Sequence, residues 1–375
     1  MFYSLLNSLS TIVIFQLLLL TLFLFSSRKG KPLSNRLLAI FFLLLAINLS
    51  DGLLVYYGFY QRFPQFAHLE DGFVFLLGPV LYFYTRSMVY SHFRFRAKDL
   101  VHLIPFVLFT ISFQIFYHLQ PSDFQKVIQS AVHRQQLPME FYFSIIAIHG
   151  HVGIYLVFAY RQIILYQLQL QEKFSHLGKR NLNWLLFVVL SVCVILILSF
   201  IYTLLPLTTR KWFDSGLMVV MGFIFIFTNV IVWRALKQPE IFLGVEEELT
   251  KKKYAGSTLS ETERKDGLAK LELLLASSKV FLNADITIEQ LAEDINLPPR
   301  KVSQMINESY KQNFFDFINS LRIQEAQRIM QESTDSKLTV LEIMYQSGFN
   351  SKSSFNTLFK KKTGQTPSEY RKHLK

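Results

Sequence analysis

Seven long apolar stretches fill the first 236 residues of the 375-residue chain and limit its fold more than any other feature. A helix needs about 20 residues to cross the roughly 30 Å hydrocarbon layer of a bilayer. We therefore expect membrane-spanning helices near residues 5–25, 37–57, 69–90, 100–118, 141–165, 184–205 and 216–236. The fourth stretch contains Pro105, which a membrane helix tolerates when neighbouring groups bond to the freed carbonyl. The sequence thus predicts a bundle of seven transmembrane helices.

Lysine and arginine in the connecting loops predict the orientation of this bundle, because cytoplasmic loops retain cations. The loops after the first, third and fifth stretches, counted together with Arg86 and Arg161 at the ends of the adjoining stretches, carry twelve of these residues, whereas the alternate loops carry five. We expect the N-terminus outside and the chain after Leu236 in the cytoplasm, as in a multi-pass protein of the cytoplasmic (inner) membrane. The first stretch lacks a cationic leader and a small-residue cleavage site, which favours a membrane helix over a signal peptide.

Charge and cysteine content narrow the function classes. The net charge of +12 fits both the cationic flanks of membrane helices and a nucleic-acid partner. Charged residues become frequent only from Lys237 onward. The single cysteine, Cys193, excludes a disulfide framework and a cysteine-based zinc site. The sequence predicts no cofactor and no metal.

A few polar residues fall at membrane depth, where they are costly and often functional. Asp51, His149 and His151 are the candidates for sensing a signal, and hydrogen bonding between helices is the alternative for each. Since His149 and His151 are two residues apart, they point to nearly opposite helix faces and do not share a metal site. The pair Gly78-Pro79 indicates a kink or a close helix contact, and packing without a ligand is its simpler interpretation.

The hydrophilic remainder of the chain regains a helical pattern after a linker at residues 237–259. The sequence SETE, from Ser260, is a capping box and predicts a helix over residues 261–277. Thr287 and Pro299 then mark the starts of two short helices with a tight turn between them. In the second helix the outward polar face consists of Arg300, Ser303, Gln304 and Asn307. Such side chains can bind base edges in the major groove, although a plain helical hairpin remains the alternative.

The same pattern returns at residues 339–364, after a continuous amphipathic helix over residues 314–333. Its second helix presents Lys352, Ser353, Asn356 and Thr357, with Lys360, Lys361 and Lys362 in the last turn. From Asn350 to the end there are seven cations against Glu369 alone, which favours contact with phosphates. Two helix-turn-helix units on one helix could read successive major grooves, about 34 Å apart. We therefore expect double-stranded DNA as a partner.

The sequences "RIQEAQRIM" (322–330) and "GFNSKSSFNTLFKKKTGQTPSEYR" (348–371) resemble the DNA-binding domain of AraC/XylS-type transcription regulators. The resemblance covers residues 261–373 and implies a seven-helix, two-unit fold and a regulator, often an activator that contacts RNA polymerase. By position, the family's base-reading residues correspond to Arg300, Ser303 and Gln304 in the first unit and to Lys352, Ser353, Asn356 and Thr357 in the second. The stretch "LLGPVLYFYTRS" (76–87) is similar to the membrane segment of membrane-embedded members, which implies a sensor with an unnamed signal.

These observations predict an all-α chain with a sensor domain at 1–236, a linker at 237–259 and a double helix-turn-helix domain at 260–375. We interpret the chain as a membrane-embedded one-component transcription regulator and not an enzyme, because no phosphate loop, nucleophile motif or carboxylate cluster is present. The alternatives are a transporter or membrane enzyme with an autoregulatory DNA-binding tail, and a protein-interaction module in place of DNA binding. A small-molecule or membrane signal could act through a homodimer of the bundle, through the linker, or through proteolytic release of the tail.

Overall fold

The computed structural model describes residues 2–27, 31–67, 69–90, 92–121, 123–125, 127, 139–178, 182–204, 210–237, 260–332 and 338–374. The chain divides into two compact units. Unit 1 comprises Met1–Ile164 and Leu182–Glu248, and unit 2 comprises Leu165–Asn181 and Leu249–Lys375. The described residues form helices, apart from an isolated antiparallel bridge between Phe174 and Thr287. The predicted all-α class is therefore confirmed, whereas the predicted linker at 237–259 lies outside the described residues except for Lys237.

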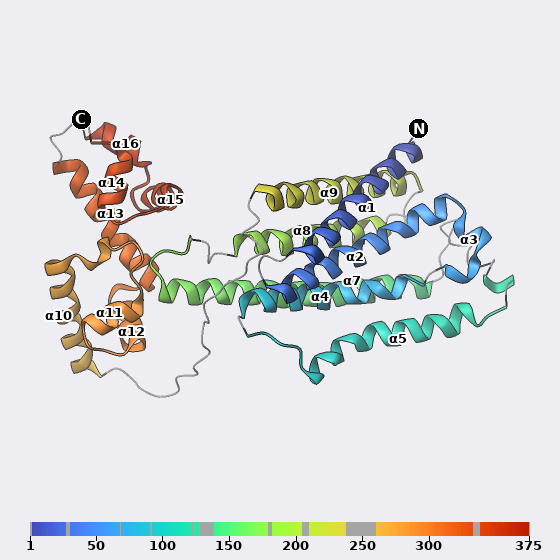
Figure 1. Ribbon diagram of the computed structural model, residues 1–375, viewed down its shortest axis with the longest axis horizontal. Coiled ribbons are helices and arrows are strands. Elements are labelled where there is room, and N and C mark those ends of the chain that lie inside the picture. The colour runs from blue at the N-terminus through green and yellow to red at the C-terminus, as the bar shows by residue number, and fades with distance from the viewer. Residues whose placement is uncertain are drawn as a thin grey trace. The chain divides into compact units, whose positions relative to one another are not determined.

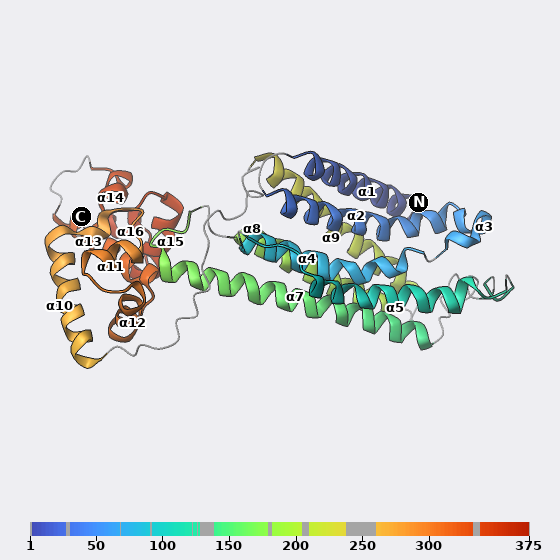
Figure 2. The same cartoon turned by 60° about the horizontal axis from the view of Figure 1, so that its bottom comes forward.

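Unit 1 is built from long apolar helices that lie side by side in both Figure 1 and Figure 2. They are α1 (Phe2–Ser26), α2 (Pro32–Tyr56), α4 (Val74–Val89), α5 (Ile104–Phe113), α7 (Met139–Lys173, which enters unit 2 at Leu165), α8 (Asn183–Leu204) and α9 (Arg210–Lys237), with the single-turn α3 (Phe59–Arg62) after α2. Short 3₁₀ turns occupy Pro64–Phe66, Asp71–Phe73 and Ala97–Leu103, and a π turn occupies Gln114–His118. Among the described residues, seven helical segments are long and apolar enough to cross a membrane, as the seven apolar stretches predict.

Two helices differ in detail from the sequence prediction. Pro105 lies in the first turn of α5 and not in a helix interior, because proline lacks the N–H that an interior turn would use. A 3₁₀ segment precedes α5 and the π turn follows it, so the fourth span is not one regular helix. Helix α7 continues past the predicted end at residue 165 to Lys173, because the sequence YQLQLQEK contains good helix formers and no breaker.

Close contacts and polar bridges join the helices of unit 1. Helix α1 packs against α2 and α9, α2 packs against α4, and α8 packs against α9. Gln16 on α1 accepts a hydrogen bond from the Thr228 hydroxyl of α9 (2.8 Å) and donates one to Asn229 (3.3 Å). A Cβ added to Gly78 would lie 3.0 Å from the Cβ of Tyr155. Gly78-Pro79 in α4 is therefore a site of close contact with α7, the packing interpretation of this motif.

Unit 2 contains the C-terminal helices shown in Figures 1 and 2. They are α10 (Glu261–Ser278), α11 (Ile288–Asp294), α12 (Pro299–Tyr310), α13 (Phe314–Glu332), α14 (Val340–Gln346), α15 (Lys352–Thr363) and α16 (Pro367–His373). Capping boxes start four of these helices, since a hydroxyl and the side chain three residues later satisfy each other's backbone N–H. The pairs are Ser260–Glu263, Thr287–Gln290, Thr339–Glu342 and Thr366–Glu369. These short helices thus begin where local hydrogen bonding dictates.

Helix α13 belongs to both hydrophobic cores of unit 2. Its N-terminal part gives Phe314, Phe317 and Ile318 to a core formed with α10, α11 and α12. Its C-terminal part gives Ile323, Ala326 and Met330 to a second core formed with α14 and α15. A backbone contact also joins the two halves, because a Cβ at Gly348 (φ 86°) would lie 2.8 Å from the Cα of Leu282. Unit 2 is thus two helix-turn-helix units on one shared helix.

Candidate nucleic-acid interface

The first helix-turn-helix unit consists of α11 and α12. Asn296 adopts a left-handed conformation (φ 54°) in the turn, and the Leu297 N–H donates to the Ala292 carbonyl at 2.9 Å. Pro299 stands in the first turn of α12, where its missing N–H has no cost. Val302, Met305 and Ile306 are buried on one face of α12. The face with Arg300, Ser303, Gln304 and Asn307 therefore points away from the core.

The structure places these four residues along one face but gives them different surroundings. Arg300 is exposed, and the other three are half-buried. The Ser303 hydroxyl donates to Glu172 Oε2 at 2.6 Å, and Asn307 Nδ2 donates to the same oxygen at 3.3 Å. Gln304 Nε2 donates to Glu308 at 2.8 Å. Glu172 lies in the last turn of α7, within unit 2, so the polar face of α12 already holds a carboxylate.

The second helix-turn-helix unit consists of α14 and α15. Gly348 supplies the left-handed turn (φ 86°), and the Ser351 side chain accepts the Ser354 N–H at the start of α15. Phe355 and Phe359 are buried beneath α15, and Gly364 (φ 79°) ends the helix. As in the first unit, a tight turn precedes a second helix with one apolar face, but α15 has a side-chain cap whereas α12 starts at Pro299 without one.

The outward face of α15 is open. Lys352, Ser353, Thr357, Lys360 and Lys361 are exposed, and Asn356 is half-buried. No other described residue hydrogen-bonds to the side chains of Lys352, Ser353, Asn356 or Thr357. Lys361 Nζ lies 3.8 Å from Asp316 Oδ1, a surface ion pair of little strength. The six predicted contact residues on α15 thus form one cationic face.

Two carboxylates of unit 2 are paired with cations outside α15. Hydrogen bonding to Lys301, followed by the Ser260 cap, lowers the pKa of Glu263 to about 2. Hydrogen bonding to Arg328, with a further contribution from Lys279, lowers the pKa of Glu325 to about 2. Both acids therefore stay ionised and form ion pairs with cations of unit 2, Glu263 with Lys301 and Glu325 with Arg328 and Lys279.

Sequence reasoning missed two residues that organise the first helix-turn-helix unit, Glu172 and Arg322. Glu172 reaches α12 from 131 residues away in sequence, and local patterning does not predict contacts at that separation. Arg322 on α13 is 1% exposed, and its guanidinium donates to the carbonyl oxygens of Phe281 (2.7 Å), Asn283 (2.8 Å) and Ala284 (3.2 Å). Burial lowers the pKa of Arg322 to about 10, so it remains charged at neutral pH. An arginine among the apolar residues of an amphipathic helix was the one available signal.

The three predicted sensing residues lie in unit 1 and have separate partners. Asp51 Oδ1 accepts a hydrogen bond from the Tyr60 hydroxyl at 2.9 Å, and Tyr60 also lies 3.3 Å from Glu70. His149 Nε2 lies 3.3 Å from the Ser199 hydroxyl on α8. His151 packs edge-on against Phe75 and Tyr155. The two histidines thus face different neighbours, as their spacing predicts, and the three residues do not form one cluster.

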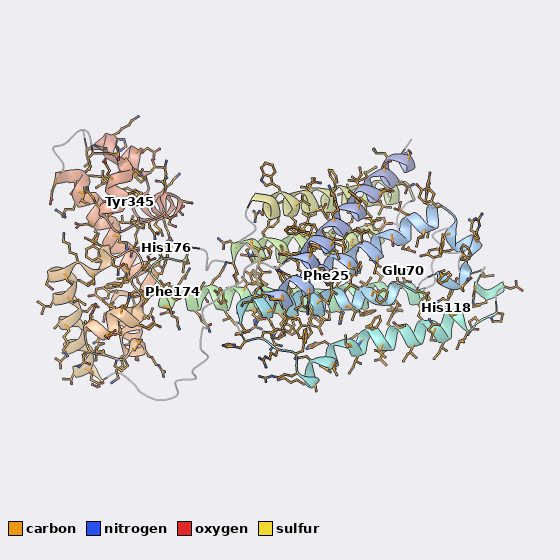
Figure 3. All side chains as sticks on the ribbon, in the orientation of Figure 1. Phe25, Glu70, His118, Phe174, His176 and Tyr345 are labelled. Carbon is orange, nitrogen blue, oxygen red and sulfur yellow. The ribbon has the colours of Figure 1, made fainter. Side chains whose placement is uncertain are left out.

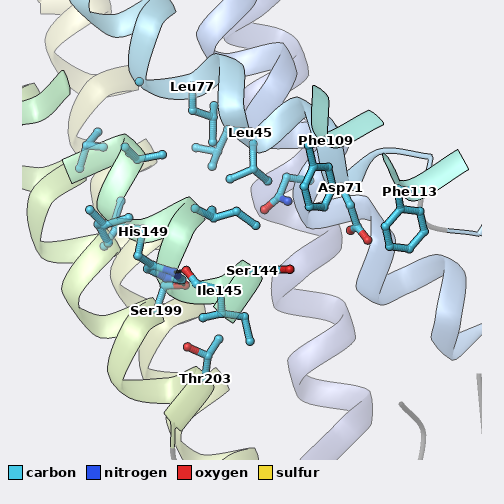
Figure 4. Close-up of a pocket in the computed structure, with 18 of the residues that line it drawn as sticks. Leu45, Asp71, Leu77, Phe109, Phe113, Ser144, Ile145, His149, Ser199 and Thr203 are labelled. Carbon is cyan, nitrogen blue, oxygen red and sulfur yellow. Dashed lines mark hydrogen bonds between the residues drawn. The ribbon is translucent and has the colours of Figure 1, made fainter. Parts of the chain in front are cut away.

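A cavity of about 900 Å³ lies within unit 1, between α2, α4, α5, α7 and α8. Most of its lining is aliphatic or aromatic, including Leu45, Leu77, Phe109 and Phe113. Figure 4 shows His149 beside Ser199, with Thr203 and Ser144 nearby, while Phe109, Phe113 and Asp71 lie at another part of the wall. Of the three predicted sensing residues only His149 lines this cavity. Within the described parts of the chain, no group of three or more His, Cys, Asp or Glu residues could hold a metal ion.

Comparison with known proteins assigns the family of the C-terminal segment. Residues 291–373 match the family model described as a helix-turn-helix domain. The segment is a helix-turn-helix domain of the AraC type. This chain is 29% identical over 126 residues to the HTH-type transcriptional activator RhaR of Salmonella dublin. It is also 31% identical over 93 residues to an uncharacterized HTH-type transcriptional regulator of Staphylococcus aureus (strain COL). The matched part of the chain is therefore a domain of transcription regulators and not of an enzyme.

These similarities cover only part of each chain. The alignments cover 34% and 25% of this chain, and 42% and 12% of the RhaR and S. aureus proteins, so the chain spans less than half the length of either relative. Among solved structures, the C-terminal domain of AraT, a response regulator from Geobacillus stearothermophilus, is similar at 27% identity and a TM-score of 0.25. That similarity covers 31% of this chain and 88% of the other.

Proposed function

We propose that this chain is a membrane-embedded one-component transcription regulator that binds DNA sequence-specifically through both helix-turn-helix units. The observation that carries the proposal is the pair of outward polar helices, α12 and α15, mounted on the shared helix α13. Such helices enter the major groove, and a rigid pair can read two neighbouring turns of one duplex. The base-reading residues are Arg300, Ser303, Gln304 and Asn307 on α12, with Lys352, Ser353, Asn356 and Thr357 on α15. Lys360 and Lys361 bind phosphates, and RNA polymerase is the partner of an activator of this type.

Membrane embedding is supported by the surface of unit 1. Large apolar side chains stay exposed along its helices, among them Leu22 (65%), Leu108 (60%) and Phe116 (74%). Such a surface is stable in hydrocarbon and prone to aggregation in water. The distribution of loop cations supports an external N-terminus and a cytoplasmic AraC-type domain in the inner membrane. A tethered domain of this kind reads only the DNA that reaches the membrane.

The test is a binding-site selection with the full-length protein in lipid nanodiscs. Random-sequence duplexes are incubated with the protein, recovered and sequenced, and affinity for the enriched site is then measured between 50 and 200 mM salt. We expect enrichment of one site with two half-sites about one helical turn apart, and an affinity that falls steeply as salt rises. Recovery of random sequence only, or an affinity independent of salt, would contradict DNA recognition and favour a protein-interaction module.

The cavity in unit 1 supports the sensing part of the proposal. Its volume of about 900 Å³ is at the upper end of small-molecule sites. Aliphatic and aromatic walls with a hydroxyl-and-imidazole group suit a lipophilic molecule with one hydrogen-bonding head group. We expect His149→Phe to abolish the response of a reporter promoter to lipophilic extracts, while membrane insertion stays normal. His151→Phe is the matched control, because His151 does not line the cavity. Equal responses of both variants would remove His149 from the signal site.

A further inference from the structure

The C-terminal end of α7 and the residues that follow it pack into the AraC-type domain. Leu165–Asn181 belong to unit 2 and not to the helical bundle, and Figure 3 labels Phe174 and His176 in this segment. We call residues 171–175 the clasp. Helix α7 contributes Ser144 and His149 to the cavity of unit 1 and also carries Glu172 of the clasp. The same helix therefore supplies residues to the proposed signal site and to the DNA-binding unit.

Backbone pairing fixes the clasp at the start of the first helix-turn-helix unit. Phe174 forms an antiparallel bridge with Thr287, which is the N-cap of α11. The Ser175 hydroxyl donates to the Ile286 carbonyl at 2.8 Å, and Ser175 is 1% exposed. Lys173 Nζ lies 3.7 Å from Glu289 on α11. The clasp is thus held in one register and is not a loosely touching loop.

Two side chains of α13 donate hydrogen bonds to the clasp. Asn319 Nδ2 donates to the Ser175 carbonyl at 2.9 Å, and Arg322 Nη2 donates to the Ser175 hydroxyl at 3.1 Å. Both donors also have partners outside the clasp. Asn319 Nδ2 bonds to the Phe315 carbonyl at 2.8 Å, and Arg322 keeps its three carbonyl acceptors in the 281–284 turn. When the clasp departs, Asn319 Nδ2 keeps the Phe315 carbonyl, Arg322 Nη1 keeps Asn319 Oδ1 and Arg322 Nη2 keeps the 283–284 carbonyls, which favours a reversible contact.

The decisive contact is between the clasp and the polar face of α12. Glu172 Oε2 accepts from Ser303 (2.6 Å) and Asn307 (3.3 Å), two of the four residues assigned to base reading. Those donors are unavailable to bases while Glu172 holds them. The carboxylate also places negative charge where DNA must enter, and like charges repel. By contrast, no described residue covers the corresponding face of α15.

We propose that the clasp is an internal competitor of DNA: it occupies the first helix-turn-helix unit until a signal at the bundle withdraws the end of α7. The inference rests on the proposed function, since it names how the DNA-binding site is regulated. In the unsignalled protein the clasp is mostly closed, so α15 binds its half-site and α12 joins only while the clasp is transiently open, which weakens binding to the two-half-site duplex. Signal releases Glu172, and α12 then joins α15 on the duplex.

The first test removes the clasp carboxylate in the full-length protein. We expect Glu172→Ala in nanodiscs to bind the selected two-half-site duplex about tenfold more tightly than wild type, since tenfold corresponds to the loss of one charged hydrogen bond. Glu293→Ala is the matched control: Glu293 is an exposed carboxylate on α11, so this variant removes the same charge without touching the clasp. An equal gain in both variants would reduce the effect to net charge and overturn the proposal.

The second test locks the clasp in a single protein preparation. Paired residues of an antiparallel bridge lie within the Cα separation that a disulfide requires, so Phe174→Cys with Thr287→Cys is expected to crosslink on oxidation. We expect the oxidised protein to lose at least about tenfold in affinity for the two-half-site duplex and to regain it on reduction. Each single-cysteine variant controls for loss of the Thr287 cap and for the native Cys193.

The outcomes separate the two proposals. Identical DNA affinity in the oxidised and reduced states, together with a wild-type affinity for Glu172→Ala, makes the clasp a fixed part of the domain and overturns the competitor while the regulator stands. Failure of wild type and of every variant to bind any duplex overturns the proposed function and the clasp with it.

Discussion

Helices α12 and α15 share one local design but differ in what their polar faces meet. Both start after a left-handed turn and bury one apolar face. On α12, two of the four polar residues bond to Glu172, whereas on α15 the side chains of Lys352, Ser353, Asn356 and Thr357 hydrogen-bond to no other described residue. Motif alone therefore does not say whether a recognition helix is available. Availability is decided by a segment that lies 131 residues away in the chain.

The largest expected effect comes from Arg322, which hydrogen-bonds to the 281–284 turn before the first helix-turn-helix unit and to Ser175 of the clasp. Arg322→Ala removes the guanidinium donors from the carbonyls of Phe281, Asn283 and Ala284. Loss of hydrogen bonds from a buried charged donor costs about 1–3 kcal/mol each. We expect amides of α11 and α12 in the full-length protein to exchange hydrogen correspondingly faster. Arg328→Ala is the control, because Arg328 lies on the same helix at the surface, and its effect should be far smaller.

The second prediction compares equivalent amides on the two recognition helices. Asn356→Ala is expected to weaken binding to the selected duplex by about 1–3 kcal/mol and to relax the preference at one base pair, since a bidentate amide can specify adenine. Asn307→Ala is expected to change affinity much less in the unsignalled protein, because Asn307 bonds to Glu172. Binding titrations against single-base variants of the duplex measure both. A larger effect at Asn307 than at Asn356 would reverse the assignment of the occupied and open helices.

Local chemistry explains what the sequence predicted well. The capping boxes at Ser260, Thr287, Thr339 and Thr366 each depend on residues three positions apart, so the short helices and their polar faces follow from short-range pattern. The seven apolar stretches likewise follow from composition over about 20 residues. These features are visible in sequence because their causes lie within a few turns of the chain.

The clasp, the cavity and the network of Arg322 have causes that span the chain. Glu172 meets Ser303, Ser175 meets Arg322, and the cavity draws on five helices. Periodicity within one segment does not predict such contacts between residues far apart in the chain. The position of Pro105 in its helix was also not predictable from local sequence, because a proline within an apolar stretch fits either a kinked helix interior or a first turn. Both are compatible with the sequence, and packing decides between them.

The third prediction tests the positive charge on the open helix. Lys360→Ala should weaken binding to specific and random duplexes alike, and lower the slope of log affinity against log salt by about 1, because a phosphate contact releases one counterion. The measurement is a salt titration with both duplexes. Loss confined to the selected duplex would instead make Lys360 a base-reading residue.

The smallest expected effect concerns Glu325, which lies on α13, the helix shared by the two helix-turn-helix units. Bonds to Arg328 and Lys279 lower its pKa from 4.5 to about 2, so the bridge contributes fully above about pH 5 and is lost as pH falls from 4.5 towards 2. Because Lys279 and Arg328 are 42% and 45% exposed, solvent screening limits the loss to less than about 1 kcal/mol. Thermal melting of unit 2 in nanodiscs at pH 5 and pH 3 should show a steeper decline for wild type than for Glu325→Gln. Parallel declines would show that Glu325 does not couple α13 to pH.

Because both hydrophobic cores include residues of α13, this helix fixes the spacing and relative rotation of α12 and α15. Each residue inserted into α13 would rotate one of these helices by about 100° and shift it by about 1.5 Å relative to the other. The distance and phase between half-sites are therefore written into the length of a single helix. Under the proposed function, promoters bound by this protein can change in base sequence but must keep the spacing and phase of their half-sites. A change in that spacing would require matching changes in α13 and in the promoters.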